Sequence, residues 1–429
     1  GAGLRVTGGG PLAGVLWWAS PAAWWATRAS WEVPPAPRRA QLIEQAVQLA
    51  ELEALLRAYQ DDPQSPPPAG GLPAARAAAA AIARSLAANQ WRASLRVCAA
   101  LLTRLWRCLY AGRVLVDAEG VERVRRLAGT RTLVYVPTHK SHLDYLILSY
   151  ALFSLGMQSP ITAAGVNLNI PIVGRVCQWF GAFYISRSTR GQSSFDAELY
   201  RKTLRGYVHA LLLNKMPVEF FIEGGRARDG RIATPRLGLL AAVLDAQLDL
   251  PLPQPVAIVP VSIAYDVPLE EPAMVQQLLG HPKKKESLLG FAHAFWGVLK
   301  LLFASGSHGM AVLSFGEPLL PENYLEVPGD APKAKTKKKK RGARKAGGGG
   351  GGGGAEPQQA GEPGGSAQVA APSGGGNGWD PDARMERLAL YPRGGEARRA
   401  ATAALGADVV AALRGANVVP QAALLLAAV

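Results

Sequence analysis

The hydrophobic pattern separates helical stretches from linkers along this chain. Apolar residues recur at helical spacing over 38–59, and an Ala-rich stretch of the same character leads to 112. Both predict helices. Between them, 61–73 is rich in proline, which predicts a linker. After 112 strand-like apolar runs begin, and we expect an α/β domain there.

The chain is therefore expected to have five parts, which we take in order. They are an apolar Trp-rich segment (1–35), a helical domain with a Pro-rich linker (36–112), the α/β domain (113–328), a disordered Lys- and Gly-rich insertion (329–378) and a partial C-terminal helical region (379–429). The insertion contains an unbroken glycine run, 347–354. Such a composition cannot build a packed core.

Three apolar segments suggest contact with a membrane. The run 6–27 is free of charge and contains four tryptophans, but prolines interrupt it. Tryptophan belongs at the headgroup level, so interfacial contact is favoured over spanning. No charged residue lies between Asp144 and Arg175, and 288–302 carries an apolar stripe at helical spacing. Either of these two segments could instead belong to the protein core.

Charge and cysteine content narrow the class of protein. The formal net charge is +15, but nine positive charges lie within 333–345, which leaves +6 for the rest. Nucleic-acid binding is therefore not demanded by the globular part. Three scattered cysteines, Cys98, Cys108 and Cys177, argue against a disulfide framework and for a reducing compartment or membrane face.

The candidate catalytic residues are His139 and Asp144. The apolar run 133–136 predicts a strand, and helical spacing resumes at Leu143. His139 is thus expected on a loop and Asp144 in the first helical turn, where the carboxylate could orient the imidazole as a general base. The nucleophile would be a substrate hydroxyl. Two alternatives remain at this point: a core histidine beside a helix-capping Asp, and a metal site that includes His142.

A second candidate site follows a predicted buried strand at 218–222. There Glu223 and a pair of glycines precede Arg226 and Arg228. Glycines at a strand end leave backbone N–H groups free to face an anion, and arginine forks suit phosphate oxygens. The segment predicts a phosphate cradle. The alternative is a solvated arginine loop paired with Glu223 and Asp229.

Four blocks of sequence in this order resemble those of the glycerolipid acyltransferase superfamily. The first is HxxxxD, from His139 to Asp144; the others are GAFYISR (181–187), VEFFIEGGRARDGR (218–231) and a strand that carries Pro260. The chain is most similar to the membrane-bound glycerol-3-phosphate acyltransferases of bacterial type. Further segments share this similarity: 102–137, 163–171, 278–288 and 315–319.

Two positions depart from the family pattern. Tyr184 stands where the second block has Phe, which keeps the aromatic ring. Ala227 stands where the third block has Ser, which removes one hydroxyl donor near the substrate phosphate. One neutral hydrogen bond contributes about 0.5–1.5 kcal/mol, so we expect weaker binding rather than lost chemistry.

The resemblance implies a mixed β-sheet wrapped by helices, with an N-terminal helical domain. It implies acyl transfer from acyl-CoA or acyl-carrier protein to the first hydroxyl of glycerol 3-phosphate, which gives lysophosphatidate for phospholipid biosynthesis. His139 would be the general base and Asp144 would orient it. Attack would be direct, with no acyl-enzyme, no metal and no cofactor besides the acyl co-substrate.

The resemblance also assigns substrate contacts and a location. It implies Arg187, Arg226 and Arg228 for the glycerol phosphate, Glu223 and Gly224 for the shape of the loop, and Pro260 for the wall of the acyl-donor site. The expected partner is membrane lipid and not nucleic acid. The expected location is the bacterial inner membrane, or an organelle membrane if the source is eukaryotic. Two alternatives are acylation of dihydroxyacetone phosphate and an inactive homologue that only contacts membranes.

Overall fold

The structure is a computed structural model. It describes residues 4–5, 37–61, 66–110, 113–166, 169, 173–186, 192–226, 232–266, 279, 309–324 and 395–427. All of these residues belong to one compact unit, made of 1–325 and 392–429. Most of the Trp-rich segment, the whole Lys- and Gly-rich insertion and the apolar stripe 288–302 lie outside the described residues.

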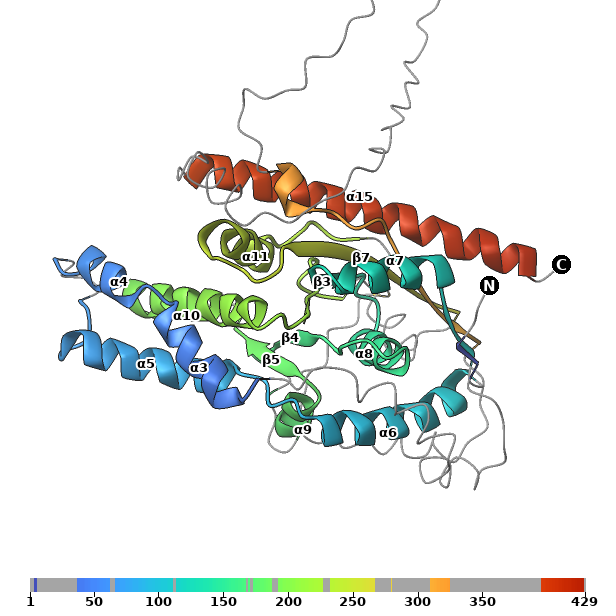
Figure 1. Cartoon of the computed structure of the whole chain (residues 1–429), viewed down its shortest axis with the longest axis horizontal. Coiled ribbons are helices and arrows are strands. Elements are labelled where there is room, and N and C mark those ends of the chain that lie inside the picture. The colour runs from blue at the N-terminus through green and yellow to red at the C-terminus, as the bar shows by residue number, and fades with distance from the viewer. Residues whose placement is uncertain are drawn as a thin grey trace, which may run out of the picture. The chain divides into compact units, whose positions relative to one another are not determined.

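An eight-stranded mixed sheet forms the centre of this unit (Figure 1). Its strands, in spatial order, are β1 (Leu4–Arg5), β2 (Arg113–Val116), β8 (Ala311–Phe315), β7 (Val256–Tyr265), β3 (Thr132–Pro137), β6 (Val218–Glu219), β4 (Ile161–Gly165) and β5 (Ala182–Ile185). The strands from β7 to β5 run parallel, whereas β8 is antiparallel to β7. The prediction of a mixed sheet is confirmed.

Helices bury both faces of the sheet. Because successive side chains of a strand point to opposite faces, Val134 and Val136 of β3 join one apolar cluster, while Leu133 and Tyr135 join another. The first cluster is completed by α3 (Arg39–Gln48), α5 (Gly71–Leu86), α10 (Ser194–Leu213) and α11 (Gly238–Asp249). The second is completed by α6 (Arg92–Tyr110), α7 (Ala118–Ala128) and α8 (Asp144–Ser154).

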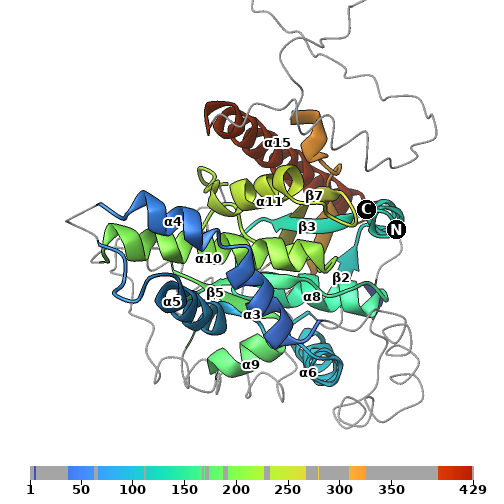
Figure 2. The same cartoon turned by 60° about the vertical axis from the view of Figure 1, so that its left-hand side comes forward.

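The N-terminal helices pack directly on the α/β core, and α3 packs across α10 (Figure 2). The predicted single helix over 38–59 is wrong, because the structure contains two helices there. Helix α3 ends at Gln48, and α4 (Leu52–Ala58) begins directly after Glu51, whose φ of 49° is left-handed. The predicted linker is shorter than expected, because α5 already begins at Gly71 and includes Pro73.

The apolar run after Asp144 belongs largely to the core. Ile147, Leu148, Ala151 and Leu152 of α8 are fully buried, which decides between the two interpretations of this run in favour of packing. Among the described helices, none combines the length and the apolar character that crossing a bilayer requires.

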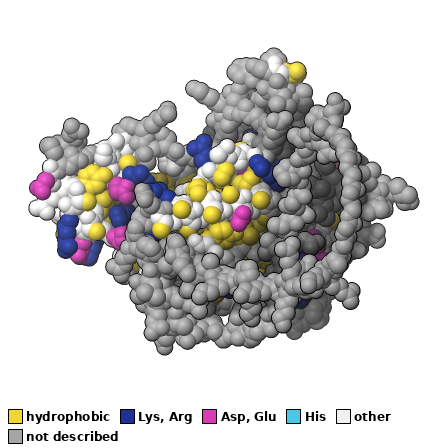
Figure 3. Space-filling view, turned by 90° about the horizontal axis from the view of Figure 1, so that it is seen from above, with side chains coloured by type: hydrophobic (Ala, Val, Ile, Leu, Met, Phe, Trp, Pro, Cys, Tyr) yellow, Lys and Arg dark blue, Asp and Glu magenta, His cyan; other side chains and the backbone are white. Residues whose placement is uncertain are grey.

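The long helix α15 (Gly395–Ala427) packs on β7 and α11. Leu405, Val409 and Leu413 are buried within the first apolar cluster, and Arg398 pairs with Asp249 at 2.7 Å. The exposed side of the described part of α15 is mostly alanine, and apolar side chains gather on that side of the molecule (Figure 3). The remaining short elements are α9 (Val173–Trp179) and the 3-10 helix η4 (Pro321–Tyr324).

Candidate active site

His139 lies on the loop between β3 and α8, as the sequence predicts. The start of this loop is tied to β7: the N–H of Thr138 donates to the carbonyl of Val261 at 2.9 Å, and the Thr138 hydroxyl oxygen accepts from the N–H of Ile263 at 3.0 Å. Both partners lie on the strand paired with β3. The loop therefore leaves the sheet in a fixed direction.

Asp144, the first residue of α8, is fully buried and receives four hydrogen bonds. Its Oδ2 lies 3.0 Å from Nδ1 of His139 and accepts from the N–H groups of Lys140 at 2.7 Å and Ser141 at 2.8 Å. Its Oδ1 accepts from the Tyr265 hydroxyl at 2.7 Å. These donors compensate for burial of the charge.

This contact fixes the state of the imidazole. A carboxylate at Nδ1 holds the ring proton of neutral His139 on that nitrogen, so Nε2 keeps a lone pair. The ring also stacks on Phe221, with centroids 4.0 Å apart and planes inclined by 27°. Its side chain is 12% exposed. His139 is thus oriented from two sides and can accept a proton at Nε2.

Glu223 connects the second candidate site to the first. Its Oε1 accepts from the backbone N–H of His139 at 2.9 Å, and its Oε2 accepts from the N–H of Ala233 at 3.1 Å. Burial raises the pKa of this carboxyl, although the two backbone hydrogen bonds oppose the shift. The glutamate therefore holds the loop of His139 and its own loop in one arrangement.

The prediction that the backbone N–H groups of the glycine pair are free to face an anion is wrong for Gly224. The N–H of Gly224 donates to the carbonyl of Phe221 at 3.0 Å, so this group closes a turn and is not free to face an anion. Gly224 has a φ of +65°, and an added Cβ would lie 2.8 Å from Cγ of Arg236. Gly225 has open space around it. The predicted strand 218–222 is also shorter, because β6 ends at Glu219 before this turn.

The remaining predicted residues differ in where they lie. Arg226 follows the glycines and is half-buried. Pro260 is buried within β7 opposite Val136, and its carbonyl accepts from the N–H of Gly316 at 2.9 Å. Arg187 and Arg228 lie outside the described residues, as does Ala227. The structure thus brings together His139, Asp144 and the Glu223 loop.

Several residues of the site were not predicted from the sequence. They are Tyr265, Phe221, Lys140 and Glu219. Burial lowers the pKa of Lys140, while the nearby carboxylates Asp144 and Glu223 oppose that shift. Glu219 is completely buried on β6, where Oε2 accepts from the Thr162 hydroxyl at 2.9 Å and burial raises its pKa well above its usual range. The signal in the sequence that could have identified Glu219 was its position as a glutamate inside an apolar strand.

Two further observations concern metal ligands and a hollow away from the His139 loop. Within the described part of the chain, no group of three His, Cys, Asp or Glu side chains could hold a metal ion.

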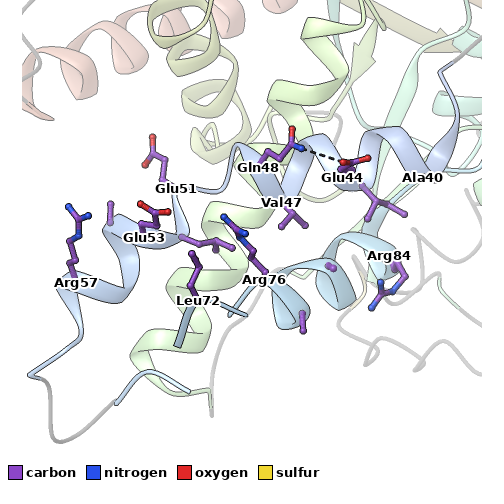
Figure 4. Close-up of a pocket in the computed structure, with 15 residues that line it drawn as sticks. Ala40, Glu44, Val47, Gln48, Glu51, Glu53, Arg57, Leu72, Arg76 and Arg84 are labelled. Carbon is purple, nitrogen blue, oxygen red and sulfur yellow. Dashed lines mark hydrogen bonds between the residues drawn. The ribbon is translucent and has the colours of Figure 1, made fainter. Parts of the chain in front are cut away.

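A hollow of about 990 Å³ lies between α3, α4 and α5 (Figure 4). It is lined by apolar residues such as Val47 and Leu72 together with Glu44 and Arg76. None of its lining residues belongs to the loop that carries His139.

Comparison with known proteins agrees with this geometry. A family model described as "Acyltransferase" matches residues 115–264, which include His139, Asp144, the Glu223 loop and β7 up to Ala264. Residues 115–264 are an acyltransferase domain. The chain is also similar to curated bacterial glycerol-3-phosphate acyltransferases.

Three of these relatives illustrate the extent of the similarity. The glycerol-3-phosphate acyltransferase of Xanthomonas campestris is 38% identical over 239 residues, which cover 56% of this chain and 25% of the relative. That of Actinobacillus succinogenes is 40% identical, with 58% and 29% covered. That of Glaesserella parasuis is 38% identical, with 65% and 32% covered. The chain thus spans between a quarter and a third of the length of these relatives.

The chain also resembles solved structures. One of them is the 1-acyl-sn-glycerophosphate acyltransferase from Thermotoga maritima, which is 16% identical to the chain. The match covers 53% of this chain and 69% of that chain, with a TM-score of 0.32.

Proposed function

We propose that this acyltransferase domain transfers a fatty acyl group to the first hydroxyl of glycerol 3-phosphate, giving lysophosphatidate. The observation that carries the proposal is the His139–Asp144 pair: a buried carboxylate with four hydrogen-bond donors, one of them the imidazole Nδ1. The names of the relatives support the same acceptor.

The reaction needs one base and no acyl-enzyme intermediate. Nε2 of His139 takes the proton of the acceptor hydroxyl as its oxygen attacks the carbonyl carbon of the acyl thioester. The C–S bond breaks as the tetrahedral intermediate collapses, and the imidazolium returns its proton to the leaving thiolate. Asp144 stabilises the imidazolium between these two transfers. No general base other than His139 is needed for this sequence.

The acceptor phosphate would bind beside Glu223. Arg226 lies three residues after this glutamate, whose side chain holds the backbone of His139. A guanidinium there can pair with a phosphate while the acceptor hydroxyl reaches the imidazole. Arg228 and Arg187 are proposed for the same phosphate on the resemblance alone.

A small, mostly apolar cavity lies next to α8. The cavity has a volume of about 50 Å³ and lies among α6, α8, β4 and the end of α9. Its lining includes Leu102, Tyr145, Phe153 and Phe180, and Tyr145 is the neighbour of Asp144 in sequence. A space of this volume holds only a small part of a fatty acyl chain, so the acyl donor is proposed on the family resemblance. The donor would be an acyl-CoA or an acyl-carrier protein.

The proposal is tested by assaying the purified chain with each donor and with three acceptors: glycerol 3-phosphate, dihydroxyacetone phosphate and lysophosphatidate. We expect acylation of glycerol 3-phosphate at its first hydroxyl, identified by mass spectrometry and NMR of the product. A preference for either other acceptor would overturn the assignment of substrate. The absence of acylation with every pair would favour an inactive homologue.

A further inference from the structure

Helix α6 exposes large apolar side chains on the side that faces away from the core. Val97 and Leu101 are each 58% exposed, although both are the kind of residue that packing normally buries. Trp91, just before the helix, is 54% exposed, and Trp179 at the end of α9 is 40% exposed. The opposite side of α6 is buried in the second apolar cluster.

These four residues lie on neighbouring elements. Ser94 Oγ lies 2.7 Å from the carbonyl oxygen of Trp91 and 2.5 Å from that of Trp179, so it links the two backbones. Val97 and Leu101 are separated by one helical turn and share one side of α6. Figures 1 and 2 both place α9 beside the first turns of α6. We call Trp91, Val97, Leu101 and Trp179 the α6 face.

The stretches of sequence that contain the α6 face carry basic residues and no acidic ones. The sequence contains no Asp or Glu in 63–116, which includes α6, or in 145–195, which includes α9. Arg96 and Arg104 on α6 are partly exposed, and Arg175 on α9 is exposed. Tryptophan and aliphatic side chains flanked by arginine suit the interface of a bilayer with anionic headgroups. A second copy of the same face would bring like charges together.

We propose that the α6 face docks onto the surface of an anionic lipid bilayer. Leu95, Cys98 and Leu102 of the same helix line the narrow apolar cavity described above. Helix α6 thus lies between the proposed lipid surface on one side and this cavity on the other. This inference deepens the proposed function and rests on it, because a fatty acyl substrate and a lipid product are the reason for the enzyme to lie at a membrane.

Helix α15 provides a matched comparison. Ala407 and Ala411 are exposed and are separated by one helical turn, as Val97 and Leu101 are. Alanine offers little side-chain area to insert among lipids, and the exposed carboxylate of Asp408 lies between the two. Introducing glutamates at this pair therefore changes the charge of an exposed helix side without touching the α6 face.

The test is binding of the full chain to phosphatidylcholine vesicles with and without phosphatidylglycerol, measured by co-flotation. We expect the wild-type chain to prefer the anionic vesicles, with weaker binding at high salt. Val97→Glu/Leu101→Glu should lower the binding constant on the order of ten-fold or more, because two apolar side chains no longer insert. Ala407→Glu/Ala411→Glu should bind as the wild type does.

The outcomes separate docking from catalysis. Turnover with a short, water-soluble acyl-CoA and no vesicles should be equal in both double variants, and thermal melts should show that both are folded. Equal vesicle binding by the wild type and the α6 variant would overturn the proposal, as would equal loss in the two variants. A wild-type dimer that the α6 substitutions dissociate, without vesicle binding, would show that a second copy covers the face.

Discussion

The hydroxyl of Tyr265 donates to Oδ1 of Asp144 at 2.7 Å across 121 residues of sequence. The tyrosine ends β7, the strand that pairs with β3 directly before the catalytic loop. Resemblance to the family pointed to Pro260 as the functional residue of this block. The structure instead places Tyr265, five residues later, in contact with the pair that carries the proposed chemistry.

Tyr265→Phe should destabilise the protein and slow the reaction. It leaves one oxygen of a buried carboxylate without its donor, and a hydrogen bond to a charged group contributes about 1.5–3 kcal/mol. We expect the free energy of unfolding to fall by about that amount. Tyr324→Phe is the control, because its partner Asp408 is exposed. Equal effects in denaturant unfolding would contradict the role assigned to Tyr265.

His139→Ala should reduce kcat by about 10²–10⁴-fold, the usual contribution of a general base. His142→Ala should retain most activity, because the carboxylate of Asp144 lies against His139. Circular dichroism should show both variants folded. Near-normal turnover by the His139 variant would contradict the proposed mechanism.

Arg226→Ala should raise KM for glycerol 3-phosphate more than KM for the acyl donor. Loss of a charge-assisted contact with phosphate costs about 1.5–3 kcal/mol, on the order of ten- to a hundred-fold. Arg236→Ala is the control, since Arg236 contacts the same loop at Gly224. Steady-state kinetics with each substrate varied in turn decide the matter. A change confined to the donor would reassign Arg226 to the acyl-CoA or carrier-protein site.

Gly224→Ala should disturb the site, whereas Gly225→Ala should not. The φ of Gly224 is +65°, and a Cβ there would press against Arg236; a Cβ on Gly225 meets nothing within 4 Å. Left-handed backbone costs an ordinary residue about 1–2 kcal/mol. Thermal unfolding should show the difference, and kcat should fall with it, because Glu223 next to this turn holds the His139 backbone. Similar behaviour of the two variants would show that the turn tolerates a side chain.

His209 predicts a loss of stability in mild acid. It is buried on α10 beside the carbonyl of Ala242, at 3.1 Å, and burial, with a smaller effect of Arg205, lowers its pKa from 6.5 to about 4. Between these values the unfolded chain binds a proton that the folded chain does not. The contribution of neutral His209 to the free energy of unfolding is therefore fully present above about pH 6.5. It falls by about 3 kcal/mol as the pH drops toward 4.

His209→Gln keeps a hydrogen-bond donor but cannot titrate. In urea titrations at several pH values, the variant should lose less stability than the wild type between pH 6.5 and 4. The carboxylates titrate in both proteins, so the difference between the two isolates the histidine. Parallel pH profiles would show that His209 is not held neutral in the folded state.

Local sequence patterns predicted the loop that carries His139 but not its surroundings. The apolar run at 133–136 and the helical spacing after it placed His139 and Asp144 correctly, because strand and helix boundaries depend on neighbouring residues. The contacts of Tyr265 and Glu223 depend instead on which strands pair. That order is set by packing across the whole sheet, and no local pattern encodes it.

The N-terminal helices show the same limit. Periodicity over 38–59 predicted one helix, yet the chain turns at Glu51. The reason lies about 160 residues away: an added Cβ on Gly206 of α10 would meet the carbonyl oxygen of Ala46 at 2.3 Å. This close approach of two helices fixes where α3 must lie, and the sequence around 51 does not reveal it.

The burial of α15 has a consequence for how the protein is made. Leu405, Val409 and Leu413 complete the cluster that also contains Leu42, so residues far apart in the sequence share one core. The core therefore cannot close on the ribosome until α15 has emerged from the exit tunnel. Until then the apolar side of α11 stays uncovered. Contacts of such long sequence separation fold slowly and expose the chain to aggregation, so its yield in cells should respond strongly to chaperone supply.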